Sequence, residues 1–236
     1  LNRLLKYTVN DSILLSNVLL SDAVMFEMLF PKEASFVVKA YEEFTLQSAT
    51  SIAERFGRDI GHISRVSSVA IEIYDKMKKL HGYKSRERTL LQVSAILQDI
   101  GKYVNVKNHA LLSYNTITNL DIVGINDHER LIIATVCYYH NGNIPSMDSP
   151  IYNQLSQEDR VMVSKLAAIL QISNAINTSH SPKFEQVSVN MKNGKLNIYL
   201  TTLKNINLEK WAFIAKSKLF KEVYGLNATI IKRGVL

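Results

Sequence analysis

Two helical segments that are apolar on nearly every face constrain the fold of this chain more than any other feature. The first spans about residues 85–99 and is most apolar between Val93 and Leu97. The second spans residues 157–176 and carries Val161, Val163, Leu166, Ile169, Leu170 and Ile172. A helix that is hydrophobic all round is stable only when it is buried on every side. The sequence therefore predicts two central helices enclosed by other elements.

Four further helices are predicted around these two, over residues 32–57, 59–80, 107–120 and 127–139. Between Ile63 and Leu80 the apolar residues recur at three- and four-residue intervals, which is the period of one buried helix face. Gly82 suits the left-handed conformation that often ends a helix, and Ser85 is a favourable cap for the helix that follows. The pattern predicts a mainly helical globular domain.

The hydrophobic period changes after Pro182. Apolar and polar residues alternate on both sides of the Asn193-Gly194 dipeptide, which is a strong signal for a β-hairpin. An amphipathic helix follows, with one apolar face, and a last strand lies around residues 228–230. The residues expected on that helix face are Leu208, Trp211, Ala215 and Leu219. These segments predict a small α+β subdomain with the order β-β-α-β.

Composition narrows the possible environments and partners. No apolar run reaches the roughly 20 residues that a membrane span requires. The single cysteine, Cys137, lies in an apolar run and is expected to be a buried thiol. One cysteine forms no intrachain disulfide, which is consistent with a cytoplasmic protein. The formal net charge of +7 favours polyanionic partners. However, the basic residues are too sparse and too rarely interleaved with aromatic ones to predict a specific nucleic-acid site.

A set of polar residues is spaced along the predicted helices in the manner of a metal site. The segments are His62-Ile-Ser-Arg65-Val66, Gln98-Asp99-Ile-Gly101, Tyr139-His140 and Gln171-Ile-Ser-Asn174. They resemble the HD superfamily, whose phosphohydrolases hold a divalent metal with a His, a His-Asp pair and a distant Asp. Here Gln98 replaces the His of the pair and Asn174 replaces the distant Asp. Neutral amides bind divalent cations poorly. The remaining candidate metal ligands are His62, Asp99 and His140, with His109 as a further candidate that lies outside the family's ligand positions.

Within that superfamily the chain resembles most the C-terminal region of the exopolyphosphatase/guanosine pentaphosphate phosphatase family. The same segments carry this resemblance, together with His109-Ala-Leu-Leu112-Ser113-Tyr114 and Val223-Tyr224-Gly225, over about residues 32–236. The resemblance implies a mainly α fold in which an HD-like helical domain, residues 31–181, precedes a small α+β subdomain, residues 182–236. Residues 1–30 are then expected to be the tail of a preceding actin-like domain.

The resemblance also implies a function. Full-length members remove terminal phosphate from polyphosphate or guanosine pentaphosphate with Mg²⁺, at a site in their actin-like domains. The implied role of this region is to extend the polyanion-binding surface and to form a homodimer contact, without a cofactor or hydrolysis of its own. The loss of acidic ligands makes the predicted cleft less negative, which favours a phosphate chain. The candidate polyanion-binding residues are His62, Arg65, Lys102 and His140, with Arg55 and Arg58 at the rim.

Two alternatives remain open at this point. One is an active HD-type phosphohydrolase in which His62, Asp99 and His140 still bind a metal. The other is a structural or signalling module without polyphosphate affinity, in which the degenerate HD fold binds a partner protein. For His62 itself, the structural alternative is a buried histidine that hydrogen-bonds Asp99 and holds two neighbouring helices together. Neither alternative involves a membrane.

Overall fold

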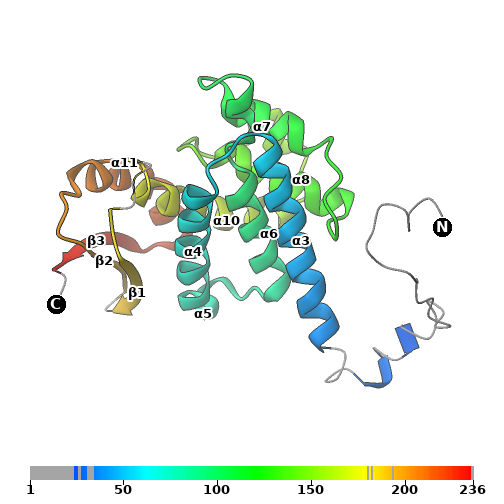
Figure 1. Cartoon of the computed structure of the whole chain (residues 1–236), viewed down its shortest axis with the longest axis horizontal. Coiled ribbons are helices and arrows are strands. Elements are labelled where there is room, and N and C mark those ends of the chain that lie inside the picture. The colour runs from blue at the N-terminus through cyan, green and yellow to red at the C-terminus, as the bar shows by residue number, and fades with distance from the viewer. Residues whose placement is uncertain are drawn as a thin grey trace, which may run out of the picture. The chain divides into compact units, whose positions relative to one another are not determined.

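The computed structural model of this chain describes residues 24–25, 28–30, 35–179, 181, 183–192 and 194–234, and only the backbone of 35–38 (Figure 1). The chain divides into two compact units, Leu1–Tyr41 and Glu42–Leu236. The predicted tail over residues 1–30 and the start of the first predicted helix at Lys32 fall almost entirely outside the described residues. No helix in the described part of the chain is long and apolar enough to cross a membrane.

The second unit is mainly helical, as the sequence predicts. The predicted helices over 127–139 and 157–176 form with the predicted bounds, whereas the predicted helix over 59–80 is divided at Met77. The helices are α3 (Ser35–Arg55), α4 (Ile60–Lys76), α5 (Lys78–His81), α6 (Ser85–Leu97), the 3-10 helix η1 (Ile100–Tyr103), α7 (His109–Ile117), α8 (Asp127–Tyr139), α9 (Pro150–Asn153) and α10 (Gln157–Ile176).

The two helices predicted to be central are the most deeply buried ones. All but one of the residues of α6 from Thr89 to Leu97 are buried, and α10 is buried continuously from Leu166 to Ser173. α10 packs against α4, α6, α8 and α11 (Asn207–Tyr224), and α6 also packs against α4 and α8 (Figure 1). Their apolar side chains share one core cluster, so the prediction of two enclosed helices is confirmed.

Capping residues explain where these helices begin and end. The side chain of Asp59 accepts from the amide of Gly61 at 2.9 Å and starts α4. Gly82 ends α5 with a φ of 73°, the left-handed conformation predicted for it. The prediction that Ser85 caps α6 is wrong, because Lys84 occupies the cap position and its amide donates to the carboxylate of Glu87 at 2.8 Å. The Glu87 carboxylate thus satisfies the amide of the N-cap residue, which is a different contact from the one expected of a capping hydroxyl.

The C-terminal elements follow the predicted β-β-α-β order. They are β1 (Gln186–Lys192), β2 (Lys195–Thr201), α11 and β3 (Asn227–Arg233). β1 pairs with β2 in antiparallel register, and β2 pairs with β3 in parallel register, which gives a sheet in the order β1-β2-β3. Gly194 in the hairpin has a φ of 67°, as an Asn-Gly turn requires.

The orientation of α11 differs from the prediction. Its buried apolar residues are Ala212, Phe213, Leu219 and Phe220, and the face they form packs against α10. Of the residues expected to be buried, only Leu219 is; Leu208, Trp211 and Ala215 are exposed, Trp211 to 72%. Two phenylalanines pack into the core, and this contact fixes the rotation of the helix.

The single cysteine is a core residue, as predicted. Cys137 in α8 is fully buried, and its thiol donates to the carbonyl of Ser94 in α6 at 3.3 Å. Burial raises the pKa of the Cys137 thiol, and the negative charge of Asp99 raises it further. Cys137 is therefore an unreactive thiol that helps to pack α8 against α6.

Candidate functional site

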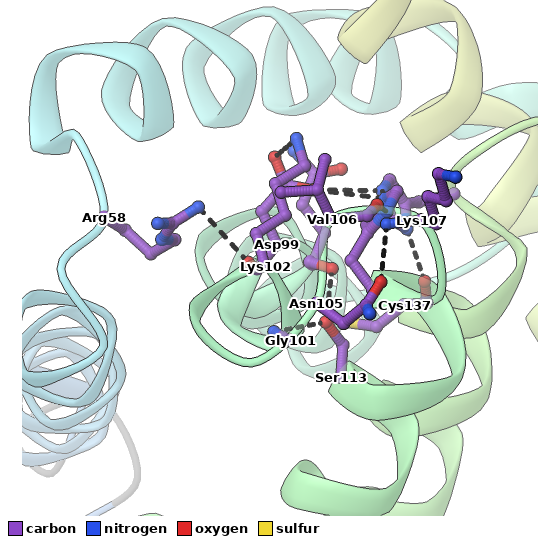
Figure 2. Close-up of polar contacts among 12 residues, drawn as sticks. Arg58, Asp99, Gly101, Lys102, Asn105, Val106, Lys107, Ser113 and Cys137 are labelled. Carbon is purple, nitrogen blue, oxygen red and sulfur yellow. Dashed lines mark hydrogen bonds and ion pairs between the residues drawn. The ribbon is translucent and has the colours of Figure 1, made fainter.

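The turn that follows α6 is anchored to α7 by buried polar contacts. The hydroxyl of Ser113 in α7 donates to the carbonyl of Gln98 at 2.8 Å and accepts from the amide of Gly101 at 2.9 Å (Figure 2). Gly101 lies directly against the backbone of α7, near the carbonyl of His109. These contacts fix the position of Asp99, which lies between α6 and η1.

The carboxylate of Asp99 is buried and meets three basic side chains. Its Oδ2 lies 2.7 Å from Nζ of Lys102, and its Oδ1 lies 3.2 Å from Nε2 of His140 and 3.6 Å from Nε2 of His109. Burial raises the pKa of the Asp99 carboxyl group, but the neighbouring His140 and the ion pair with Lys102 outweigh it. They hold the pKa of Asp99 well below its usual range. Asp99 is therefore a carboxylate at neutral pH.

Backbone carbonyls orient both imidazole rings. Nδ1 of His109 lies 2.7 Å from the carbonyl of Val106, and Nδ1 of His140 contacts the carbonyl of Cys137. A carbonyl only accepts hydrogen bonds, so Nδ1 carries the hydrogen in both rings and Nε2 carries the lone pair when the ring is neutral. The two Nε2 atoms lie 3.3 Å apart. Burial, followed by the neighbouring His140, lowers the pKa of His109.

A lysine from the C-terminal subdomain also belongs to this environment. Lys216 projects from α11, and its Cγ lies beside Gly142, just after the segment that holds His140. Burial lowers the pKa of Lys216, the charge of Asp99 raises it, and the charge of Lys102 lowers it. The charges of Asp99 and Lys102 therefore both act on the Lys216 ammonium. Sequence patterns did not indicate this residue, because nothing local in α11 links it to α6.

A pocket of about 290 Å³ opens beside Asp99. Its lining comes from the start of α4, the end of α6 and the η1 turn, and consists of Arg58, Asp59, His62, Ile63, Gln98, Asp99, Lys102 and Val106. Arg58 reaches over the turn toward the carbonyl of Asp99, with Nη1 at 3.5 Å (Figure 2). Gln98 is almost fully buried, and its Oε1 has no hydrogen-bond donor among the described residues. The pocket therefore combines two basic side chains, Arg58 and Lys102, with the carboxylates of Asp59 and Asp99 and an unsatisfied acceptor, and Lys102 is paired with Asp99.

The structure brings together only part of the predicted polyanion-binding set. Three of its members, Arg58, His62 and Lys102, line this pocket. His140 is buried beside Asp99 and does not line it. Arg65 instead lines a separate groove next to β1. Arg55 is exposed at the end of α3 and lines neither cavity.

The three side chains able to ligate a metal differ from the predicted ones by one residue. Asp99, His109 and His140 each offer a ligand atom, and these atoms lie within 4.8 Å of one another. Two of them, Asp99 and His140, belong to the predicted set, and His62 lines the adjoining pocket with Asp99. His109 does not match the family's ligand positions, so motif spacing gave it little weight. Its place in the cluster depends on how α7 packs against the turn after α6.

Comparison with known protein families covers all of these residues. A model of the Ppx/GppA phosphatase family, domain III, matches residues 46–220. The match extends from α3 through the Asp99 turn and the first two strands into α11. It spans most of the chain and agrees with the resemblance found in the sequence segments around His62, Asp99 and His140. The chain belongs to the Ppx/GppA phosphatase family and contains its domain III.

Proposed function

We propose that this domain binds inorganic polyphosphate or a guanosine polyphosphate as an accessory, non-hydrolysing part of an exopolyphosphatase-related protein. The observation that carries this proposal is that the side chain of Arg58 hydrogen-bonds backbone carbonyls at the pocket and has no carboxylate partner among the described residues. Its side chain is half-buried at the pocket and donates to the carbonyls of Phe56 at 3.2 Å and Asp99 at 3.5 Å. No carboxylate in the described part of the chain forms an ion pair with it. A guanidinium in this state can donate two parallel hydrogen bonds to a phosphate.

The surroundings of Arg58 favour an anion of several phosphates. Lys102 lines the same pocket but is paired with Asp99 at 2.7 Å, and the exposed Lys107, which follows in the next turn, adds a further positive charge (Figure 2). The net charge of +7 attracts polyanions at longer range. In contrast, two residues of the basic segment at the start of α6 are already paired, Arg86 with Glu129 and Arg88 with Asp75. The pocket is therefore the better candidate for a phosphate chain.

The test is calorimetric titration of the 236-residue chain with polyphosphate and with guanosine tetraphosphate at two salt concentrations, in the presence of EDTA. Binding should weaken with salt, because screening reduces the attraction between exposed charges. Arg58→Ala should lower the affinity about tenfold, since a hydrogen bond to a charged group contributes about 1.5–3 kcal/mol and 1.4 kcal/mol is a factor of ten.

Arg88→Ala is the matched control, because it removes the same side chain from a site already neutralised by Asp75. Affinity should stay at the wild-type level in this variant. An equal loss in both variants would mean diffuse binding by net charge, and the absence of heat with both ligands would favour the structural-module alternative. Release of phosphate by the chain alone, in a separate assay that contains a divalent metal and no EDTA, would favour the active phosphohydrolase instead.

We also propose that α11 contributes the homodimer contact. Its outer side carries Leu208, Trp211 and Ile214, spaced by three residues, and Trp211 and Ile214 are each more than 70% exposed. Leu203, in the loop before the helix, is exposed to a similar extent. Large apolar residues grouped on one surface are typical of protein–protein contacts, and Trp is enriched at their centres. A second copy of the chain is the proposed occupant, because an isologous contact would cover the same patch on both protomers.

Sedimentation velocity tests this contact directly. Wild type should sediment as a dimer at micromolar concentration, and Trp211→Ala should shift it to monomer, since a central Trp commonly contributes about 2 kcal/mol or more. Val161→Ala, which shortens an exposed apolar residue on α10, should leave the dimer intact. A monomeric wild type, or a Trp211→Ala variant that remains dimeric, would contradict the proposal.

A further inference from the structure

The three ligand atoms beside the pocket have the geometry of a metal site. We infer that Asp99, His109 and His140 bind one divalent transition-metal ion of the Zn²⁺ type through Oδ1 and the two Nε2 atoms. Two imidazoles and one carboxylate suit Zn²⁺ and similar ions better than Mg²⁺. This inference goes beyond the proposed polyphosphate binding and does not depend on it.

The separations between the ligand atoms match a tetrahedral ion. They are 3.3 Å between the two Nε2 atoms, and 3.2 and 3.6 Å from these atoms to Oδ1. Ligands placed about 2.0–2.1 Å from a tetrahedral Zn²⁺ lie about 3.3 Å from one another. The side chains therefore need only small movements to close around an ion.

The hydrogen-bonding state of the rings points the same way. Both Nδ1 atoms donate to backbone carbonyls, those of Val106 and Cys137, so both Nε2 lone pairs are directed into the cluster. Such outer hydrogen bonds are typical of metal-binding histidines, because they fix the tautomer and the ring orientation. Oδ1 of Asp99 adds a third acceptor. A single proton can form a hydrogen bond between only two of these three acceptor atoms, whereas a metal ion can bind all three.

The surroundings leave the ligands available. Lys102 contacts Oδ2 of Asp99 at 2.7 Å and leaves Oδ1 to the imidazoles. Asp99 also borders the 290 Å³ pocket, although its Oδ1 is buried, so the three ligand atoms lie next to this pocket and not within it. Gln98, which precedes Asp99, lines the same pocket, and its buried Oε1 is an acceptor with no hydrogen-bond donor among the described residues. The positive charge of Lys102 balances the negative charge of Asp99. The charge of the bound ion is therefore not compensated by Asp99, and this favours an anionic fourth ligand, such as a phosphate oxygen.

The experiment uses the 236-residue chain after dialysis against EDTA. Titration with Zn²⁺, followed by calorimetry, should show one ion bound per chain. Titration with Co²⁺ should give the intense visible absorption of tetrahedral cobalt. His109→Gln and His140→Gln should each weaken Zn²⁺ binding by about 100-fold or more, while Gln retains a donor for the backbone carbonyl. Circular dichroism confirms that both variants are folded.

His128→Gln is the matched control, because His128 is an exposed histidine on α8 that pairs with Asp159 at 2.9 Å. It should bind Zn²⁺ like wild type. If His140→Gln does not fold, His109→Gln decides alone, since His109 lies on a different helix. The inference is overturned by a wild-type chain that binds no Zn²⁺ or by wild-type affinity in His109→Gln. No polyphosphate is present, and the polyphosphate titration contains EDTA, so the two proposals fail independently.

Discussion

Replacing Gly101 with alanine should lower the free energy of unfolding by about 3 kcal/mol or more. A Cβ at this position would lie 2.5 Å from the amide nitrogen of Ser113 and 2.9 Å from the carbonyl carbon of Leu112, and closer still to the carbonyl oxygen of His109. All three atoms belong to the backbone of α7, so no flexible side chain can move aside. Overpacking a core commonly costs about 1–3 kcal/mol, and a clash with a helix backbone belongs at the upper end.

Urea denaturation followed by circular dichroism measures this loss. Gly234→Ala is the matched control, because an added Cβ there meets no atom within 4 Å. We expect the free energy of unfolding of this control to stay within about 0.5 kcal/mol of the wild-type value, as for most surface substitutions. A Gly101→Ala variant as stable as Gly234→Ala would show that the turn and α7 can separate freely. In that case the Asp99 group would not be held by the contact described here.

Much of the fold follows from hydrophobic periodicity. The bounds of α8 and α10 match the predicted ranges, because long segments with strong apolar patterns leave little freedom in where a helix begins and ends. The β-β-α-β order likewise follows from the alternation on either side of Asn193-Gly194. The likeness to HD proteins and the domain boundaries at residues 30 and 181 stay predictions.

The orientation of α11 could not be read in the same way. Its sequence has apolar residues around most of the helix, so more than one face qualifies as the buried one. The structure selects the face with Phe213 and Phe220, which packs against α10, and leaves Trp211 in solvent. Packing against a neighbouring helix decides between faces of similar hydrophobicity, and a sequence pattern does not contain that neighbour.

The residues of the candidate site were likewise predicted only in part. Arg58, His62 and Lys102 line one pocket, whereas the sequence analysis expected His62 and Lys102 in one cleft with Arg65 and His140, and Arg58 at its rim. His109 was only a secondary candidate ligand and Lys216 was not expected near Asp99, because each approaches it through packing between elements. His109 approaches because Gly101 allows α7 to lie against the turn, and Lys216 because α11 packs against α10. Residues brought together by such contacts carry no local signal in the chain.

Replacing Glu209 with alanine should lower the free energy of unfolding by roughly 3 kcal/mol at neutral pH. The side chain of Glu209 in α11 is fully buried, and its carboxylate lies 2.9 Å from Nζ of Lys183, in the segment that leads into β1. Removing one partner of a buried ion pair typically costs about 3–5 kcal/mol, because the other charge loses its compensation. Lys183 is partly exposed, so the lower end of that range applies.

The control lies on the same helix. Glu222 forms an exposed pair with Lys218 at 3.9 Å, and surface pairs of this kind contribute about 0–1 kcal/mol. Glu222→Ala should therefore change the unfolding midpoint in urea by much less than Glu209→Ala does. Equal and small effects of the two substitutions would show that Lys183 and Glu209 do not stabilise the junction between the helices and the sheet.

The pH dependence separates the ion pair at Glu209 from simple loss of packing. Burial alone would raise the pKa of Glu209, but the hydrogen bonds from Lys183 and Ser179 outweigh it and lower the pKa below the usual 4.5. A carboxyl group with a lowered pKa in the folded state stabilises the fold fully above its unfolded pKa, and this contribution is lost as the pH falls through the folded value. The difference in unfolding free energy between wild type and Glu209→Ala should thus be largest near neutral pH and narrow between about pH 5 and pH 3. A difference that stays constant across this range would mean that Glu209 stabilises the fold through packing and not through its charge.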